Sequence, residues 1–364
     1  MIGSRKDEHV SLAIGQRRNP PPASDFDDVV FVHHALRGIN REDVVLDTEF
    51  AGVHWRAPLY INAMTGGTAR TGAINRDLAI AARETGLAIA TGSMSAFFAD
   101  PDTAATFRIM REVNPAGFIM ANVNATTSVE NALRAIDLVA ADALQIHLNA
   151  IQEIVMPEGD RSFADWSEQI ARIAAAAPVP VFVKEVGFGL SRETVTHLRD
   201  LGVRVADVGG RGGTNFARIE NDRRTAGEYR YLADWGQSAA QCLIETYDVR
   251  DISLLASGGV RNPLDVARSL ALGAVAAGVS GRFLQVLVEE GLPTLITEIG
   301  SWLEQLTSLM TVLGANTPGA LRDCDLVVVG GLQVACAARG VDPIRFRDQR
   351  RSDPTGATGT RSES

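Results

Sequence analysis

The chain has 364 residues, 46% of them hydrophobic, and its 35 basic and 44 acidic side chains leave a formal charge of −9. This balance disfavours general affinity for nucleic acid or an anionic membrane, so we expect neither as a partner. Cys242, Cys324 and Cys336 form no C-x-x-C pair, which favours a reducing compartment over disulfides or structural zinc. No apolar run is long enough to span a bilayer, and we expect a cytoplasmic protein.

In chain order, residues 1–50 come before any regular pattern, and we expect them to form an amino-terminal arm broken by three prolines at 20–22. Short β-rich runs then alternate with alanine-rich helical stretches. The eight predicted strands are 59–63, 87–90, 117–121, 143–148, 181–186, 203–208, 252–256 and 274–278. Helices are predicted between them, among others at 74–84, 129–140, 166–176 and 192–201.

Eight strand–helix units in series predict an α/β fold, a closed (β/α)8 TIM barrel with an amino-terminal arm and a carboxyl-terminal helical extension. We expect the arm at 1–50, the barrel with its carboxyl-terminal helices at 51–347, and a disordered tail rich in Ser, Thr, Gly and Arg at 348–364. The connection from 208 to 238 is longer than the usual loop after a barrel strand. Long loops at the carboxyl ends of strands are functional or disordered.

Polar and glycine-rich residues recur at the points where these strands end. In a barrel those ends share one rim, which is the face that carries active sites. The segments concerned are 63–67, 91–95, 122–124, 147–153, 184–187, 207–215, 257–261 and 278–282.

The strand predicted at 143–148 places Gln145, His147 and Asn149 on one face, because side chains alternate along a strand. Buried polar side chains are costly unless something hydrogen-bonds or coordinates them. A satisfied network at the strand end would account for His147 alone. Together with Gln152 and Glu153, however, the cluster predicts a bound polar ligand or a metal.

The last two rim segments have the form of a phosphate cradle. Gly258 and Gly259 join a strand to a helix, and Gly281 opens the next helix, so backbone N–H groups would face an anion. Barrels that bind phosphorylated ligands use the loops after strands seven and eight in this way. Lys184 lies at the end of an apolar strand, where it snorkels to solvent, pairs with Glu185, or places a cation beside a flavin ring.

Together these motifs resemble the type 2 isopentenyl-diphosphate isomerases over roughly residues 4 to 340. The matching stretches are Arg-Lys-Asp-Glu-His at 5–9, Ala-Met-Thr-Gly-Gly at 63–67, His-Leu-Asn with Gln-Glu between 147 and 153, 156–161, 207–215 and 257–261. The resemblance implies an enzyme that uses reduced FMN and Mg²⁺ to interconvert isopentenyl and dimethylallyl diphosphate without net redox change. It also implies NADPH or NADH as reductant, and a homo-oligomer, either a tetramer or an octamer built from tetramers.

The resemblance also implies roles for individual residues. Glu153 matches the Mg²⁺ ligand, and Gln152, His147 and Lys184 match the groups closest to catalysis. Residues matching the substrate-binding positions are Arg5, Lys6, His9, Ser93, Ser95, His147, Asn149 and Gln152. Residues matching the FMN positions are Ala63, Met64, Thr65, Ser93, Asn122, Lys184, Gly209, Thr214, Gly258, Gly259, Ser280 and Gly281, with Gly209 standing where some relatives have serine.

The implied reaction is a 1,3 proton shift in which the reduced flavin acts as acid and base; a competing assignment makes Gln152 a proton relay. An FMN-dependent oxidase or dehydrogenase of 2-hydroxy acids is an alternative, but it needs a histidine where residues 208–211 read Val-Gly-Gly-Arg. A nucleotide dehydrogenase needs a loop cysteine, and no cysteine lies in a rim segment. A flavin-storage barrel would have no use for Arg5 or Lys6.

Overall fold

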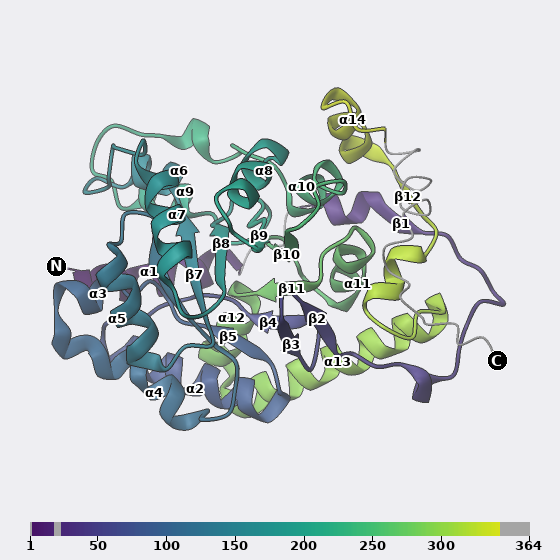
Figure 1. The fold of residues 1–364 in the computed structure, drawn as a ribbon, viewed down its shortest axis with the longest axis horizontal. Coiled ribbons are helices and arrows are strands. Elements are labelled where there is room, and N and C mark those ends of the chain that lie inside the picture. Colours follow the sequence, from purple (N-terminus) through teal and green to yellow (C-terminus); the bar gives the residue numbers. More distant parts are fainter. Residues whose placement is uncertain (1, 18–22, 343–364) are drawn as a thin grey trace.

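The computed structural model describes residues 2–17 and 23–342. Eight parallel strands close into a barrel in the order β4 to β11, and β11 pairs with β4 (Figure 1). The predicted barrel is therefore confirmed, with every predicted strand present. The strands are β4 Leu59–Ile61, β5 Ala88–Ala90, β6 Ile119–Asn124, β7 Ala143–Leu148, β8 Val181–Glu185, β9 Val205–Asp207, β10 Ser253–Ser257 and β11 Ala276–Val279.

Helices follow the strands, and side chains of Thr68, Ser128, Ser191 and Ser238 cap the first turns of four of them. The long connection after β9 contains α9 Phe216–Asp222 and a 3-10 turn, η4 Arg230–Leu232. The barrel helices are α2 Ala69–Thr85, α3 Ser95–Ala99, α4 Ala105–Val113, α5 Val129–Val139, α6 Ala150–Val155, α7 Trp166–Ala176, α8 Arg192–Asp200, α9 Phe216–Asp222, α10 Ala239–Glu245, α11 Pro263–Ala271 and α12 Gly281–Glu290. The carboxyl-terminal helices are α13 Leu292–Leu313 and α14 Gly330–Ala338.

The segment before the barrel is more structured than an arm. It begins with a helix, α1 Ile2–Arg17, and later contributes β1 Val29–Phe31, which pairs antiparallel with β12 Leu326–Val328 near the other end of the chain (Figure 1). The limit predicted at residue 50 falls at the end of β2 Thr48–Phe50, inside the hairpin that β2 forms with β3 Val53–Trp55. The prolines at 20–22 and the tail at 348–364 lie outside the described residues.

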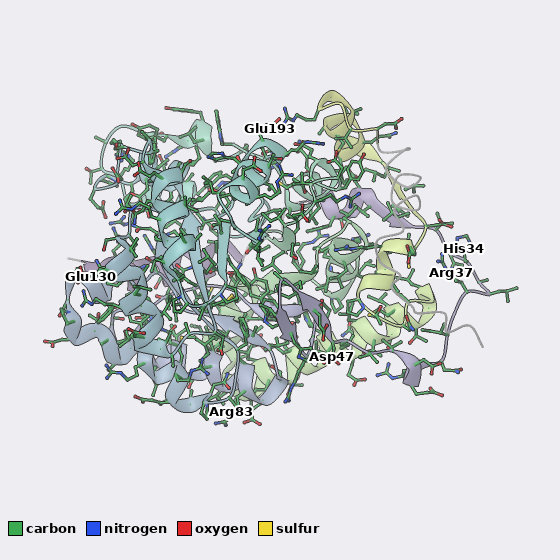
Figure 2. All side chains as sticks on the ribbon, viewed as in Figure 1. His34, Arg37, Asp47, Arg83, Glu130 and Glu193 are labelled. Carbon is green, nitrogen blue, oxygen red and sulfur yellow. The ribbon has the colours of Figure 1, made fainter. Side chains whose placement is uncertain are left out.

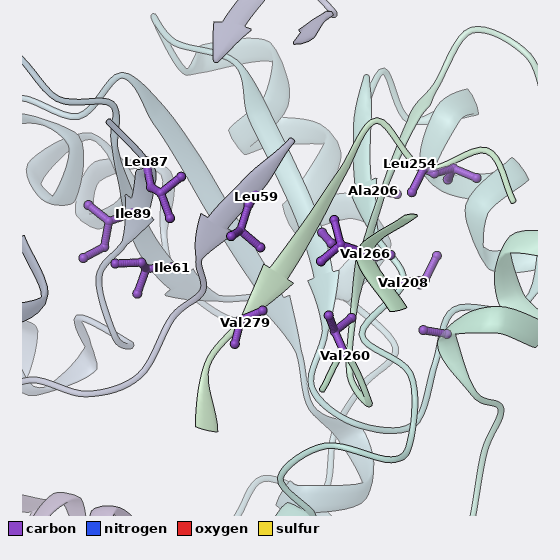
Figure 3. Close-up of a cluster of buried hydrophobic side chains, with 14 of the residues drawn as sticks. Leu59, Ile61, Leu87, Ile89, Ala206, Val208, Leu254, Val260, Val266 and Val279 are labelled. Atoms are coloured by element: carbon purple, nitrogen blue, oxygen red, sulfur yellow. The ribbon is translucent and has the colours of Figure 1, made fainter. Parts of the chain in front are cut away.

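Barrel side chains alternate between two apolar layers, as strand geometry requires. Leu59, Ile61 and Ile89 point outward and belong to the large core between the strands and the surrounding helices, where Val266 of α11 also lies (Figure 3). The residues between them on the strands point inward. Tyr60 and Phe182 belong to a second apolar cluster inside the barrel.

The β2–β3 hairpin adds its aromatic rings to this inner cluster. The ring of Trp55 lies 5.3 Å from that of Tyr60, and the ring of Phe50 lies 6.1 Å from that of Phe182. Residues further along the same inward faces, such as Asn62, Lys184 and Ser257, are polar. The barrel interior is thus apolar where the strands begin and polar where they end.

Charged side chains lie mainly on the outside of this framework, as Arg83, Glu130 and Glu193 do in Figure 2. Glu193 of α8 pairs with Arg339 beyond α14 at 2.7 Å, which links the barrel to the carboxyl-terminal helices. None of the described helices is long and apolar enough to cross a membrane.

Candidate active site

A cavity of about 270 Å³ opens at the carboxyl ends of the barrel strands, where the sequence predicts the site. The structure brings all the predicted site residues together around it, although they come from α1 and from the last residues of the eight barrel strands or the segments that follow them. The residues concerned are Arg5, Lys6, His9, Ala63, Met64, Thr65, Ser93, Ser95, Asn122, His147, Asn149, Gln152, Glu153, Lys184, Gly209, Thr214, Gly258, Gly259, Ser280 and Gly281.

Helix α1 supplies three basic side chains to the cavity: Arg5, Lys6 and His9. Their spacing of one, three and four residues places them on adjacent parts of one helical surface. Burial, reinforced by the neighbouring Arg5 charge, lowers the pKa of Lys6 to about 8. No hydrogen bond joins the Lys6 ammonium to another described residue, and Arg5 Nε is buried without a partner. This part of the cavity therefore has positive charge that is not fully neutralised.

Ion pairs join α1 to the loops beneath it. Arg223, just after α9, lies 3.2 Å from Glu8 and 2.9 Å from Glu158. Arg5 approaches the same Glu158 oxygen at 3.4 Å. These half-exposed pairs are individually weak, but together they position α1 over the cavity.

Glu220 of α9 is a buried carboxylate next to the predicted substrate pocket. Its side chain accepts a hydrogen bond from Gln152 Nε2 at 2.8 Å, pairs with Arg223, and lies 3.0 Å from His9 Nε2. Burial would raise the pKa of Glu220, but the contacts with His9, Gln152 and Arg223 outweigh it and lower the pKa to about 2. Glu220 thus fixes the orientation of the Gln152 amide, whose nitrogen faces the carboxylate.

His147 is a neutral imidazole in this site. Burial, with the Lys184 and Lys6 charges adding to it, lowers its pKa to about 3. Its Nδ1 lies 2.8 Å from Asn122 Oδ1. At neutral pH the ring therefore has one N–H donor and one acceptor nitrogen.

Lys184 is 6% exposed, and its Nζ donates to the backbone oxygen of Glu185 at 2.9 Å. Burial lowers its pKa, opposed by the charges of Asp207 and Glu185. The Glu185 carboxylate turns away and accepts the N–H groups of Phe188 and Gly189. The predicted alternative, a side-chain pair between Lys184 and Glu185, does not form, and the ammonium lies at the cavity wall.

The predicted phosphate cradle is lined by backbone. Gly258 has a φ of +88°, and a Cβ there would lie 1.8 Å from the Gly210 carbonyl oxygen, so only glycine fits. The N–H groups of Gly258 and Gly259 bond to no other described residue. Arg261 pairs instead with Asp27 and Asp265. An anion here would be held by backbone N–H groups and helix dipoles.

Glu153 is the candidate cation ligand among the residues that line the cavity. Its Oε1 accepts from Asn149 Nδ2 at 2.7 Å, and its Oε2 accepts from the Asp160 N–H at 2.8 Å. Among residues 2–17 and 23–342, no three His, Cys, Asp or Glu side chains cluster to form a metal cage. Any Mg²⁺ bound by Glu153 would take its other ligands from water or from substrate oxygens.

Several residues of the site were missed by sequence reasoning. Glu220 and Arg223 belong to the long connection after β9, where no periodic signal distinguishes them from surface charges. Asn62 and Asp207 are buried under the cavity in a hydrogen-bonded pair. In the sequence, the only feature that marks Asn62 and Asp207 is a polar residue at the inward position where a barrel strand ends. The same feature was recognised for Lys184.

Comparisons with known proteins agree with this geometry. Residues 99–327 match the FMN-dependent dehydrogenase family. A protein of Kitasatospora griseola named isopentenyl-diphosphate delta-isomerase is 61% identical over 97% of this chain and 98% of its own length. One of the same name from Nocardia farcinica is 60% identical over 95% and 96%. The chain belongs to the type 2 isopentenyl-diphosphate delta-isomerase family. The resemblance inferred from the rim motifs is thereby confirmed.

Mandelate oxidase is among the solved structures that resemble this member of the isopentenyl-diphosphate delta-isomerase family. One mandelate oxidase structure has a TM-score of 0.61 at 16% identity, covering 88% of this chain and 90% of its own. Another, described with a monooxide FMN adduct, has a TM-score of 0.60 at 17% identity, covering 88% and 92%. At this identity the likeness shows a shared barrel fold.

The alternatives raised by the sequence lack matching residues in the site. The segment at 208–211, after β9, contains no histidine to serve a 2-hydroxy-acid oxidase as base. All three cysteines are buried, and none lines the cavity. Burial raises the pKa of Cys336 to about 12, which disfavours a thiolate nucleophile.

Proposed function

We propose that this protein interconverts isopentenyl and dimethylallyl diphosphate by a 1,3 proton shift, using reduced FMN and Mg²⁺, in isoprenoid biosynthesis. One observation carries the proposal. The cavity of a chain 61% identical to a named isomerase combines basic side chains of α1, a carboxylate at Glu153 and a glycine-lined anion cradle. Those are the groups that a diphosphate, its metal and a phosphate-bearing flavin require.

The residues present fit FMN. Glycine backbone at 258, 259 and 281 would hold its phosphate, and Thr65 Oγ1 is buried at the cavity without a hydrogen-bond partner in the described structure. Lys184 would place a cation beside the ring and stabilise its anionic reduced form. When bound, reduced FMN would supply an electron-rich ring able to exchange protons with the substrate. Reduction would come from NADPH or NADH.

The residues of α1 would bind the substrate diphosphate. Arg5 and Lys6 supply positive charge, and His9 can add a donor, as can the hydroxyls of Ser93 and Ser95, which lie 3.3 Å apart. Glu153 would bring Mg²⁺ to the same diphosphate oxygens, with water as the remaining ligands. A chain with a charge of −9 needs such a local cluster to attract an anion.

The hydrocarbon part of the substrate would lie against His147, Asn149 and Gln152. His147 is neutral and Gln152 cannot titrate, so the two residues do not form a conventional acid and base pair. Glu220 holds the Gln152 amide in one orientation, with its nitrogen toward the carboxylate. The proposed proton transfer therefore has two routes, one directly through the flavin and one through Gln152. Assembly into a tetramer or octamer and a cytoplasmic location are further parts of it.

The test of this function is a single reduction followed by many turnovers. The purified protein is reduced once by light without oxygen, then given isopentenyl diphosphate and Mg²⁺. We expect many equivalents of dimethylallyl diphosphate per flavin, with no nicotinamide consumed in step with product. Stoichiometric nicotinamide oxidation, or equal activity with oxidised FMN, would contradict the proposal.

Lys6 predicts a pH dependence of substrate capture. Because its pKa in the free protein is lowered to about 8, the ammonium is present below that pH and is lost above it. We expect kcat/KM for isopentenyl diphosphate to fall as pH rises through about 8, with less change in kcat, because bound diphosphate favours the ammonium. Lys6→Arg, which stays charged, should flatten the profile. A wild-type profile unchanged across that range would remove Lys6 from diphosphate binding.

Lys184 predicts a change in flavin chemistry. Lys184→Met should remove the cation at the cavity wall and make the potential of bound FMN more negative, by on the order of 50 mV, since about 30 mV corresponds to 1.4 kcal/mol for two electrons. Anaerobic titration against a reference dye measures this shift. Arg199 of α8, which is partly exposed and does not line the cavity, provides the control, and Arg199→Ala should leave the potential unchanged.

A further inference from the structure

Polar side chains beneath the cavity form a continuous hydrogen-bonded chain that ends at His147. It begins at Asp207, which is fully buried. The Asp207 oxygens accept from the Tyr60 hydroxyl at 2.5 Å, the Asn62 amide at 3.0 Å, the Ser257 hydroxyl at 2.7 and 2.9 Å, and the Gly209 N–H at 3.2 Å. The backbone N–H of Gly209 can only donate, so the carboxylate acts here as an acceptor.

Asn62 is the next link, and its orientation is determined by a backbone group. The Ala63 N–H donates to Asn62 Oδ1 at 2.8 Å. A backbone N–H cannot accept, so the amide atom that faces it must be the oxygen. The amide nitrogen of Asn62 therefore faces Asp207, which agrees with an acceptor at that end.

Gln145 is the next link, and the orientation of its side-chain amide follows from that of Asn62. Its Nε2 faces Asn62 Oδ1 at 3.5 Å, and turning the amide over would set two oxygens against each other. Its Oε1 accepts from Asn122 Nδ2 at 2.6 Å. That leaves Asn122 Oδ1 facing His147 Nδ1 at 2.8 Å. An amide oxygen can only accept, so the hydrogen of the neutral ring belongs on Nδ1.

We propose that Gln145 is a positioning residue that, through Asn122, holds the cavity-lining His147 as the tautomer protonated on Nδ1 and leaves its Nε2 as a hydrogen-bond acceptor. Gln145 is fully buried and does not line the cavity, so it acts only through its neighbours. An acceptor at Nε2 receives an N–H or O–H from a ligand, whereas the other tautomer offers that ligand a second donor. The kinetic consequence rests on the proposed function; the tautomer does not.

The tautomer is measured by nitrogen NMR of the full-length, flavin-containing protein labelled with ¹⁵N-histidine. The chain has six histidines, and His147→Asn identifies the resonances of His147 by their loss. We expect Nδ1 to resonate as a protonated nitrogen and Nε2 as an unprotonated one coupled to both carbon-bound ring protons. A wild-type ring protonated on Nε2 overturns the proposal.

Gln145→Met tests the link itself, because it keeps the side-chain length and removes both amide groups. Asn122 is then free to turn, so we expect a mixture of His147 tautomers and a fall in kcat of about tenfold, with KM for isopentenyl diphosphate changed less than about twofold. Gln145→Glu is the matched control. Its buried acid can donate to Asn62 Oδ1 and still accept from Asn122, so the wild-type tautomer should return.

A wild-type ring spectrum in Gln145→Met shows that Gln145 does not hold the tautomer. If Gln145→Met loses flavin and fold, Asn62→Ala breaks the preceding link, and an unchanged His147 spectrum in that variant overturns the proposal equally. A protein with the expected His147 spectrum but no isomerase activity in any form leaves the tautomer standing and refutes the proposed function instead.

Discussion

Replacing Glu153 by glutamine should abolish Mg²⁺-dependent isomerisation while FMN stays bound. Glu153 is the carboxylate that lies beside the predicted substrate residues, and it is absent from the predicted FMN contacts. Glutamine keeps the size of the side chain but removes the charge that a hard divalent cation needs. Loss of metal stabilisation is worth several kcal/mol, so we expect kcat/KM to fall by about 10³-fold or more.

The measurement is an Mg²⁺ titration of initial rates, accompanied by the flavin absorbance of the purified variant. The Glu153 carboxylate accepts hydrogen bonds from Asn149 and from the Asp160 N–H, and the glutamine weakens one of them. Far-ultraviolet circular dichroism therefore checks that the variant is folded. Exposed Glu168 of α7 offers the matched control, because Glu168→Gln removes the same charge away from the cavity. Near-normal turnover with normal Mg²⁺ dependence in Glu153→Gln would exclude it as the metal ligand.

The barrel could be predicted because its signal is local. Strand β7 matches its predicted bounds, 143–148, since six residues there alternate cleanly between the outer core and the interior. Strand β4 is shorter than predicted, because its last predicted residues, Asn62 and Ala63, belong to the segment that lines the cavity. Strand β9 begins two residues later and ends one residue earlier than predicted. Rim position was then enough to predict which barrel segments line the cavity, whereas the residues of α1 were predicted from the family resemblance.

Helix α1 could not be predicted as a helix, because local propensity there is weak. Gly15 lies within it, and its apolar face is short. Burial of Val10, Ala13 and Ile14 against the barrel helices stabilises it instead. Such packing depends on residues hundreds of positions away, which a pattern within one segment does not report.

The roles of Glu220 and Gln145 escaped prediction for the same reason. Glu220 acquires its partners from α1, α6 and the residue after α9, and only the folded chain brings these together. Gln145 was recognised as part of a polar strand face, but its partners come from β6 and from the residue that follows β4. A sequence indicates which residues need a polar partner, and the fold decides which partner they have.

Deleting residues 1–9 should leave the barrel folded and nearly eliminate capture of the diphosphate. No barrel strand lies in that segment, and Val10, Ala13 and Ile14 remain to pack the rest of α1. Arg5 and Lys6 are lost with it, and charge-assisted contacts contribute about 1.5–3 kcal/mol each. We expect kcat/KM for isopentenyl diphosphate to fall by on the order of 10²- to 10⁴-fold, chiefly through KM, with flavin content unchanged.

The double variant Arg5→Ala/Lys6→Ala distinguishes the loss of the two positive charges from the loss of the first part of helix α1. It loses the pair between Arg5 and Glu158 but keeps Asp7, which bonds to Thr68 at 2.9 Å, and Glu8, which pairs with Arg223, so two contacts that hold α1 in place persist. If the charges bind the diphosphate, the double variant should lose nearly as much affinity as the deletion. Titration with inorganic diphosphate, followed by calorimetry, measures that affinity without turnover. Equal binding by the deleted and full-length proteins would show that α1 covers the cavity without contacting the ligand.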